Sequence, residues 1–186
     1  MPWGSGVFSR RAGWTPATAT RRWLDRIPGS CVVAEPLTTG LPWLASIHSS
    51  ATAVPADRLA GTDLTTVLRC DDKAMWEIDL IADDLKASFA SEPVIAGGDL
   101  NSSIRLDTSW SDANARLFAN LDRLGIHVLR AEGGIEPQTF YRSGTRPLQL
   151  DYFLTDQRTA ARIEGWTVLT DVVEALGLSD HAPIQL

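Results

Sequence analysis

Two polar clusters that follow apolar segments have residue types suited to catalysis. In the first, the apolar residues 94–96 lead through two glycines to Asp99 and Asn101. Side chains alternate between the faces of a strand, so these two are predicted to leave the strand end on the same side. The glycines add no bulk where a ligand or another backbone comes close. The second cluster is Ser179-Asp180-His181, directly before the last apolar residues.

Two further polar residues, His48 and Asp151, lie in apolar, strand-like segments. A buried, unpaired carboxylate is costly, so Asp151 needs a partner. If Asp99, Asp151 and Asp180 converge, each pair costs about 3 kcal/mol at roughly 5 Å and an effective dielectric of about 20. A divalent cation or a protonated histidine would relieve that repulsion. Oxygen ligands point to magnesium, manganese or calcium before zinc.

His181 is the candidate general base. Adjacent residues on a strand point to opposite faces, so Asp180 and His181 need not pair with each other. Asp151 or Asp99 could orient the imidazole instead, and a histidine held in this way could take a proton from water. His48 could lie opposite and donate a proton to a leaving oxygen.

Each of these residues also has an ordinary structural explanation. His48 alone is typical of a strand end, and Asp99-Leu100-Asn101 alone is typical of a turn. Asp151 could pair with one of the many arginines, and Asp180-His181 could lie in a surface loop. Their joint order along the chain favours the functional interpretation.

Composition indicates a single soluble globular domain over residues 1–186. Hydrophobic residues make up 44% and charged residues 22% of the 186 positions, and there is no apolar run of about 18 residues that could span a membrane. The net charge of -6 argues against indiscriminate polyanion binding. Two isolated cysteines, Cys31 and Cys70, make neither a disulfide framework nor a zinc site, so we expect a reducing, cytoplasmic location. Serine-hydrolase and phosphate-loop motifs are absent from the sequence.

Hydrophobic patterning predicts a mixed-sheet α/β domain with helices outside the sheets. The predicted helices cover residues 71–89 and, with Ser111 as the cap, residues 111–124. The segments 31–37 and 41–50 are predicted to form a hairpin around Thr38-Thr39-Gly40. The other predicted strands are 6–9, 94–99, 126–130, 139–142, 148–155, 165–170 and 182–186.

Several short segments carry a resemblance that covers nearly the whole chain. In order, they are Gly6-Val7-Phe8-Ser9-Arg10, Ile47-His48-Ser49, Gly98-Asp99-Leu100-Asn101, Gln138-Thr139-Phe140-Tyr141, Leu150-Asp151-Tyr152 and Leu178-Ser179-Asp180-His181-Ala182-Pro183. Together they resemble the endonuclease/exonuclease/phosphatase superfamily, the group of deoxyribonuclease I and exonuclease III. The resemblance implies a four-layered α/β sandwich of two mixed sheets flanked by helices. It also implies that the early arginines belong to the fold and not to a transit peptide.

The resemblance further implies metal-assisted hydrolysis of phosphoester bonds, with Mg²⁺ or Mn²⁺ as cofactor. Asp99 and Asp180 are the implied metal residues. The implied roles near the phosphate are a base or phosphate contact (His181), its orienting partner (Asp151), a group that positions the nucleophile (Asp99), a ligand for the phosphoryl oxygens (Asn101) and a leaving-side histidine (His48).

The sequence departs from the family pattern at its start. Complete members begin with a strand that carries an asparagine and a second that carries a metal-binding glutamate, whereas the first glutamate here is Glu35, in the wrong strand. We therefore expect an N-terminally incomplete domain that holds its cation weakly: a fragment, a mis-assigned start or a degraded copy. Missing strands would leave a sheet edge unpaired.

Three functional interpretations follow from the sequence. The first is a metal-dependent phosphodiesterase or nuclease, acting on DNA, RNA, a phospholipid head group or a small phosphoester. The second is a catalytically impaired remnant that binds phosphate groups or a partner. The third is a plain α/β binding domain, which would gain support if the two polar clusters lay far apart. The oligomeric state stays open.

Overall fold

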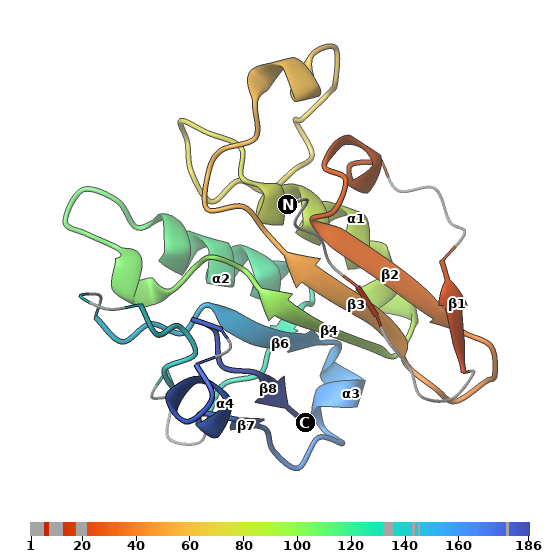
Figure 1. Ribbon diagram of the computed structural model, residues 1–186. Helices are drawn as coiled ribbons and strands as arrows, with labels where there is room; N and C mark the ends of the chain where they lie inside the picture. Colours follow the sequence, from red (N-terminus) through yellow and green to blue (C-terminus); the bar gives the residue numbers. More distant parts are fainter. Residues whose placement is uncertain are drawn as a thin grey trace.

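A six-stranded mixed sheet organises the chain (Figure 1). The computed structural model describes residues 6–7, 13–17, 22–131, 136–142, 144, 146–177 and 179–186. The strands of this sheet, in spatial order, are β1 (Trp14–Pro16), β2 (Cys31–Pro36), β3 (Trp43–His48), β4 (Val94–Asp99), β6 (Asp151–Thr155) and β5 (His127–Val128). A second sheet pairs β7 (Thr167–Val168) with β8 (Ile184–Gln185). The helices are α1 (Glu77–Ser91), α2 (Ala113–Arg123), α3 (Gln157–Ala160) and α4 (Asp171–Glu174).

The pairing of the central strands follows from their connections. The short turn between β2 and β3 makes them an antiparallel hairpin, as predicted. The chain then crosses over through α1, so β4 lies parallel to β3. β6 runs antiparallel to β4. The ends of β3 and β4 therefore lie at the same edge of the sheet as the start of β6.

Side chains alternate between the two faces of the sheet, so each face packs against a different layer. Ala45, Ile47 and Ala96 belong to the same buried core as residues of α1 and α2, and Tyr152 contacts Phe118 of α2 with ring centroids 5.2 Å apart. The next residue, Phe153, points the other way and meets Trp166, just before β7. The predicted mixed α/β fold is thus confirmed. The predicted four-layered sandwich is seen in part, because the second sheet has only β7 and β8 within the described ranges.

The start of α1 differs from the prediction. The helix begins at Glu77 and not at residue 71, because Asp79 is turned back toward the preceding loop. Its buried carboxylate accepts hydrogen bonds from the backbone N–H groups of Cys70 and Trp76. These bonds satisfy donors that would otherwise be unpaired at the helix start.

The cap of α2 also differs. Ser111 does not cap this helix. Instead the carboxylate of Asp107 accepts from the backbone N–H groups of Asn114 and Ala115, at 2.9 and 2.8 Å. A carboxylate suits the positive end of a helix, and sequence spacing alone does not reveal a cap that reaches back across a loop.

Several strand predictions are corrected as well. Residues 139–142 form no strand, because only Phe140 pairs, through isolated bridges to Leu148 and His181. β1 was not predicted, and the other late strands are shorter than expected. Most of the predicted strand 6–9 lies outside the described residues. None of the helices in the described part of the chain has the length and apolar character needed to cross a bilayer.

Gly98 is required by the close approach of β3 and β4. Its φ is +137°, and an added Cβ would lie 2.0 Å from the carbonyl oxygen of Ile47. Backbone at that distance cannot move aside without breaking the strand pair, so no larger residue fits. The predicted close approach of another backbone is confirmed, and it holds the end of β4 against β3.

Candidate active site

The sheet register brings three predicted site residues to one edge. His48 ends β3 opposite Asp99 in the parallel pair, and Asp99 ends β4 opposite Asp151 in the antiparallel pair. Residues that are paired across neighbouring strands have side chains on the same face. The three polar groups therefore share one face at the end of the sheet, away from the helical core.

Asn101 reaches Asp99 through a turn and not through strand alternation. β4 ends at Asp99, and Asn101 has a φ of +49°, the only positive value among the described non-glycine residues. Asparagine tolerates this left-handed conformation better than most residues. Its Nδ2 donates to Asp99 Oδ2 at 3.0 Å and to the carbonyl oxygen of Ser49 at 2.7 Å. The two residues come together as predicted, for a different reason.

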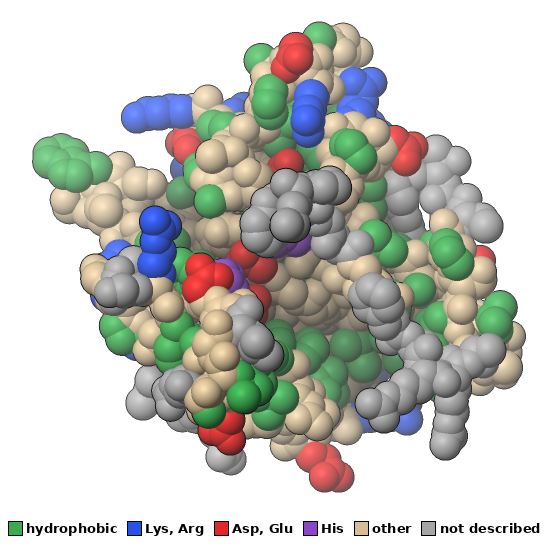
Figure 2. All heavy atoms as spheres, in the orientation of Figure 1, with side chains coloured by type: hydrophobic (Ala, Val, Ile, Leu, Met, Phe, Trp, Pro, Cys, Tyr) green, Lys and Arg blue, Asp and Glu red, His purple; other side chains and the backbone are tan. Residues whose placement is uncertain are grey.

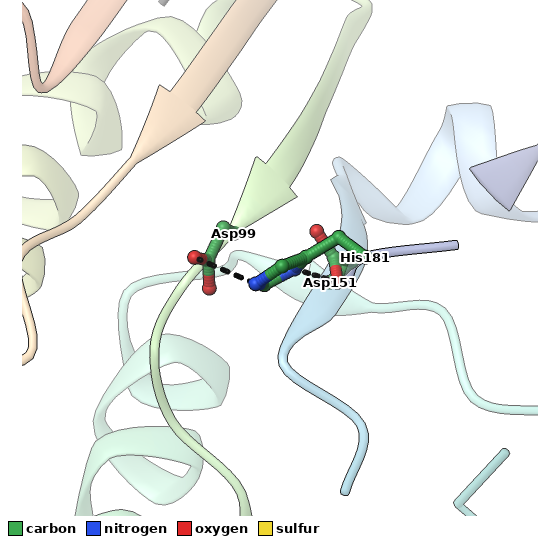
Figure 3. Close-up of side chains that lie close together, drawn as sticks. All are labelled: Asp99, Asp151 and His181. Atoms are coloured by element: carbon green, nitrogen blue, oxygen red, sulfur yellow. Dashed lines mark hydrogen bonds and ion pairs between the residues drawn. The ribbon is translucent and has the colours of Figure 1, made fainter. Parts of the chain in front are cut away.

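His181 lies between the two carboxylates (Figure 3). Its Nδ1 is 2.9 Å from Asp151 Oδ2, and its Nε2 is 3.9 Å from Asp99 Oδ2. His48 Nε2 approaches the same oxygen of Asp99 at 3.8 Å. Of the two orienting partners that the sequence left open, Asp151 is the one within hydrogen-bond distance. The two polar clusters, 82 positions apart in the chain at Asp99 and His181, meet in space.

Residues that the sequence analysis assigned no role hold this arrangement in place. The hydroxyl oxygen of Thr139, which is fully buried, accepts from the backbone N–H groups of Leu150 and Asp151. Phe140 pairs with His181 through an isolated bridge, and the two rings lie 5.0 Å apart. Segment 138–141 is therefore the support for the aspartate–histidine pair. Its signal in the sequence was a threonine within a short, strand-like segment.

The site opens into a cleft of about 570 Å³. Figure 2 shows acidic and histidine side chains meeting in a hollow at the middle of this face. The lining includes His48, Asp99, Asn101, Asp151, Asp180 and His181. Asp180 is exposed and does not belong to the close cluster of Asp99, Asp151 and His181. All of the predicted site residues thus line one cleft, with Asp180 at its outer part.

Burial and mutual charge shift two of the titrating groups. Burial, together with the nearby Asp151 carboxylate, raises the pKa of Asp99 to about 6. The hydrogen bond from His181 to Asp151 raises the pKa of the imidazole above its ordinary value of 6.5, with further contributions from Asp99 and Asp180. The cleft is therefore strongly anionic and favours bound positive charge.

The donor set fits a divalent cation. One ligand atom from each of Asp99, Asp151 and His181 lies within 4.8 Å of the others, which gives two carboxylates and an imidazole. Such oxygen-rich sets suit Mg²⁺ or Mn²⁺, which complete their coordination with water and substrate oxygens. Burial is the main cause of the raised pKa of Asp99, and a cation bound beside this carboxylate would lower it.

The electrostatics predict that Asp99→Asn stabilises the protein at neutral pH when a chelator is present. Below the ordinary pKa of 3.8, Asp99 is protonated whether the chain is folded or unfolded. Between pH 3.8 and about 6 the unfolded chain ionises Asp99 while the folded chain keeps it protonated, so the stability of the wild type falls over that range and stays lower above it. At about 1.36 kcal/mol per pKa unit, the gain is up to about 3 kcal/mol at pH 8 and small at pH 4. Urea unfolding at both pH values measures it.

Asp122→Asn on the exposed face of α2 is the matched control, and its stability should change little at either pH. Equal stability of Asp99→Asn and wild type at pH 8 would contradict the predicted cost of the buried charge.

The sequence belongs to a known family. The profile of the Endonuclease/Exonuclease/phosphatase family matches residues 2–181, so this chain is a member of that family. The resemblance drawn from the short segments is thereby confirmed. A sequence search of curated proteins finds no match.

Solved structures agree on the fold. The 3'-5' exonuclease NExo from Neisseria meningitidis shares 14% identity, with a TM-score of 0.64 over 92% of this chain and 70% of its own. The 3' phosphatase NExo from Neisseria, bound to product DNA hairpin, gives 0.65 at 14% identity and the same coverage. The endonuclease domain of TRAS1, a telomere-specific non-LTR retrotransposon, gives 0.55 at 18% identity over 92% of this chain and 67% of its own. At these identities the likeness shows the fold alone.

Proposed function

We propose that this chain is a divalent-metal-dependent phosphodiesterase that activates water for attack on phosphorus. One observation carries the proposal: His181 is held by Asp151 at 2.9 Å and turns its other nitrogen toward Asp99 in an open cleft. A carboxylate-held imidazole with one nitrogen free to face substrate is the arrangement of a general base.

The cleft residues supply the steps of the reaction. His181 Nε2 takes a proton from water while the water oxygen bonds to phosphorus. Asp151 keeps the proton on Nδ1 and stabilises the imidazolium that forms. The bond from phosphorus to the leaving oxygen breaks, and His48, on the other side of Asp99, donates a proton to that oxygen. Asp99 positions the water, and Asn101 holds the phosphoryl oxygens.

A cation would be held chiefly by Asp99, with the Asp151 carboxylate beside it and Asp180 further out in the cleft, which leaves Nε2 of His181 free to act as the base. Bound Mg²⁺ or Mn²⁺ supplies positive charge at the phosphoryl oxygens and acidifies water. Two close carboxylates are few for a tightly bound cation, so we propose a weak site that fills only when substrate oxygens complete it.

Nucleic acid is the proposed substrate class. It is supported by the relatives of the same fold, among which NExo is described as an exonuclease and as bound to DNA. Cys31 and Cys70 are not joined in a disulfide, which suits the proposed cytoplasmic location.

The test is hydrolysis of bis(4-nitrophenyl) phosphate, which releases a coloured product. We expect release with Mn²⁺ or Mg²⁺, loss of release with excess chelator and recovery when the metal is restored. Activity that is indifferent to chelator would contradict the metal role. A chain that binds phosphate but hydrolyses nothing at any metal concentration would instead be the non-catalytic remnant.

A further inference from the structure

A second hollow adjoins the catalytic cleft. It has a volume of about 270 Å³ and lies between the segment that precedes α1 and the segment that joins β4 to α2. Asn101 lines both hollows. A substrate with its phosphate at Asn101 therefore has a neighbouring group within reach of this pocket. Its lining includes Asp71, Trp76, Ile78, Ser102, Ala113 and Leu117.

The lining combines an apolar floor with an aromatic wall. Ile78 and Leu117 are buried in the core and form the floor. The half-buried indole of Trp76 stands beside them, and its Nε1 donates to Asp71 at 3.4 Å. A compact pocket of this kind suits a flat ring and is too small for an acyl chain. Stacking of bases on aromatic side chains is a common source of affinity for single strands.

Ser102 supplies an unused polar group. The residue is 8% exposed and lines the pocket, yet its hydroxyl makes no hydrogen bond to any residue that the structure describes. The amide of Asn114, by contrast, is fully engaged with Ser103 and Asp107. A hydroxyl in the wall of a pocket can donate and accept, and the edge of a nucleobase offers both donors and acceptors.

An exposed tryptophan lies beside the pocket. Trp110 is 91% exposed and directly precedes Ser111, which lines the pocket. A bridge between Thr108 and Ser111 closes the tip of the loop that carries it, and Figure 1 shows this loop between β4 and α2 extending away from the sheet. An indole exposed to solvent in this way offers a stacking surface for a second base.

The acidic residues near the pocket have hydrogen-bond partners, and Asp71 in the lining accepts from the backbone N–H of Lys73 and from Trp76 Nε1. Asp72 forms two bonds with Arg116, at 2.7 and 2.9 Å, and Asp107 accepts the first N–H groups of α2. The charge of Asp72 is therefore offset by Arg116, and Asp107 lies at the positive end of α2.

We propose that this pocket binds one unpaired nucleobase of a single-stranded nucleic acid, next to the phosphate that is cleaved. The proposal rests on the proposed function for its phosphate, but the recognition of the base belongs to separate residues. Ser102 contacts the edge of the base, Trp76 lies against the ring, and Trp110 stacks on a neighbouring base.

The test compares binding of two labelled oligomers in chelator, where nothing is cleaved. One is single-stranded oligothymidylate, and the other has the same phosphates but abasic sugars. We expect wild type to bind the first about tenfold or more tightly. Ala113→Leu fills the pocket from the first residue of α2 and should remove most of this preference, and Ser102→Ala should reduce it. Ala119→Leu, on the exposed face of α2, should keep it.

Two outcomes would overturn the base pocket: no preference for bases in wild type, or an unchanged preference in Ala113→Leu. Binding of phosphatidylcholine vesicles that Ala113→Leu abolishes would assign the pocket to a lipid and would also overturn it. Failure of the proposed function appears separately, as no hydrolysis of bis(4-nitrophenyl) phosphate by wild type.

Discussion

Replacing His181 by alanine is expected to lower the rate of phosphodiester hydrolysis by about 10²- to 10⁴-fold. Its Nε2 is the imidazole nitrogen that faces Asp99 and the cleft, while its Nδ1 is engaged with Asp151. Without it, the imidazole that Asp151 holds in position to take the proton from water is lost. Initial rates at saturating Mn²⁺ measure the loss.

His127 provides a matched control. It is exposed on β5 and pairs with Thr155. Thr155 is the last residue of β6, whereas Asp151 is the first, so His127 lies at the far end of that strand from the site. His127→Ala should retain the wild-type rate, and both variants should unfold near the wild-type urea concentration. A His181→Ala variant that hydrolyses the diester at full rate would show that this histidine is not the base.

Asp151→Asn is the second change with a large expected effect, a fall in kcat of about 10²- to 10⁴-fold. Asp151 acts through His181: its carboxylate accepts the Nδ1 proton and so leaves Nε2 free to act as a base. An amide can present an N–H to Nδ1 instead, which favours the unproductive tautomer.

The pH profile separates this positioning role from a purely structural one. His181 acts as a base only when it is neutral, so the wild-type rate should fall on the acid side as the imidazole becomes protonated. Because the pKa of His181 is raised, the midpoint of this acid limb should lie above pH 6.5. Removing the Asp151 carboxylate should move that limb to lower pH. Asp122→Asn on α2 should leave both the rate and the profile unchanged. If the Asp151→Asn variant had a lower rate but the same midpoint of the acid limb, the positioning role of Asp151 would be contradicted.

The central strands and most of the candidate site could be predicted from the sequence. The apolar segments around residues 31–36, 43–48 and 94–99 are short and bounded by turn residues, and all became strands at nearly those positions. The polar residues at their ends could be expected to meet because strand ends share a sheet edge. Their register, which pairs Asp99 with both His48 and Asp151, comes only from the folded sheet.

The features that could not be predicted depend on contacts over long sequence distances. The start of α1 is set by Asp79 reaching back to Cys70 and Trp76. The support of Asp151 by Thr139 exists only once residues 138–141 lie beside β6. Periodicity and local propensity contain no information on such bonds, whereas the family resemblance indicated that segment 138–141 matters without saying how.

The most direct test of the central claim is hydrolysis of a phosphodiester in water enriched in ¹⁸O, with Mn²⁺ present. If water activated in this cleft attacks phosphorus, the label should appear in the phosphoryl product, one atom for each bond cleaved, and chelator should abolish its incorporation. Product formed with the label on the leaving alcohol, or no product at any metal concentration, would contradict the account.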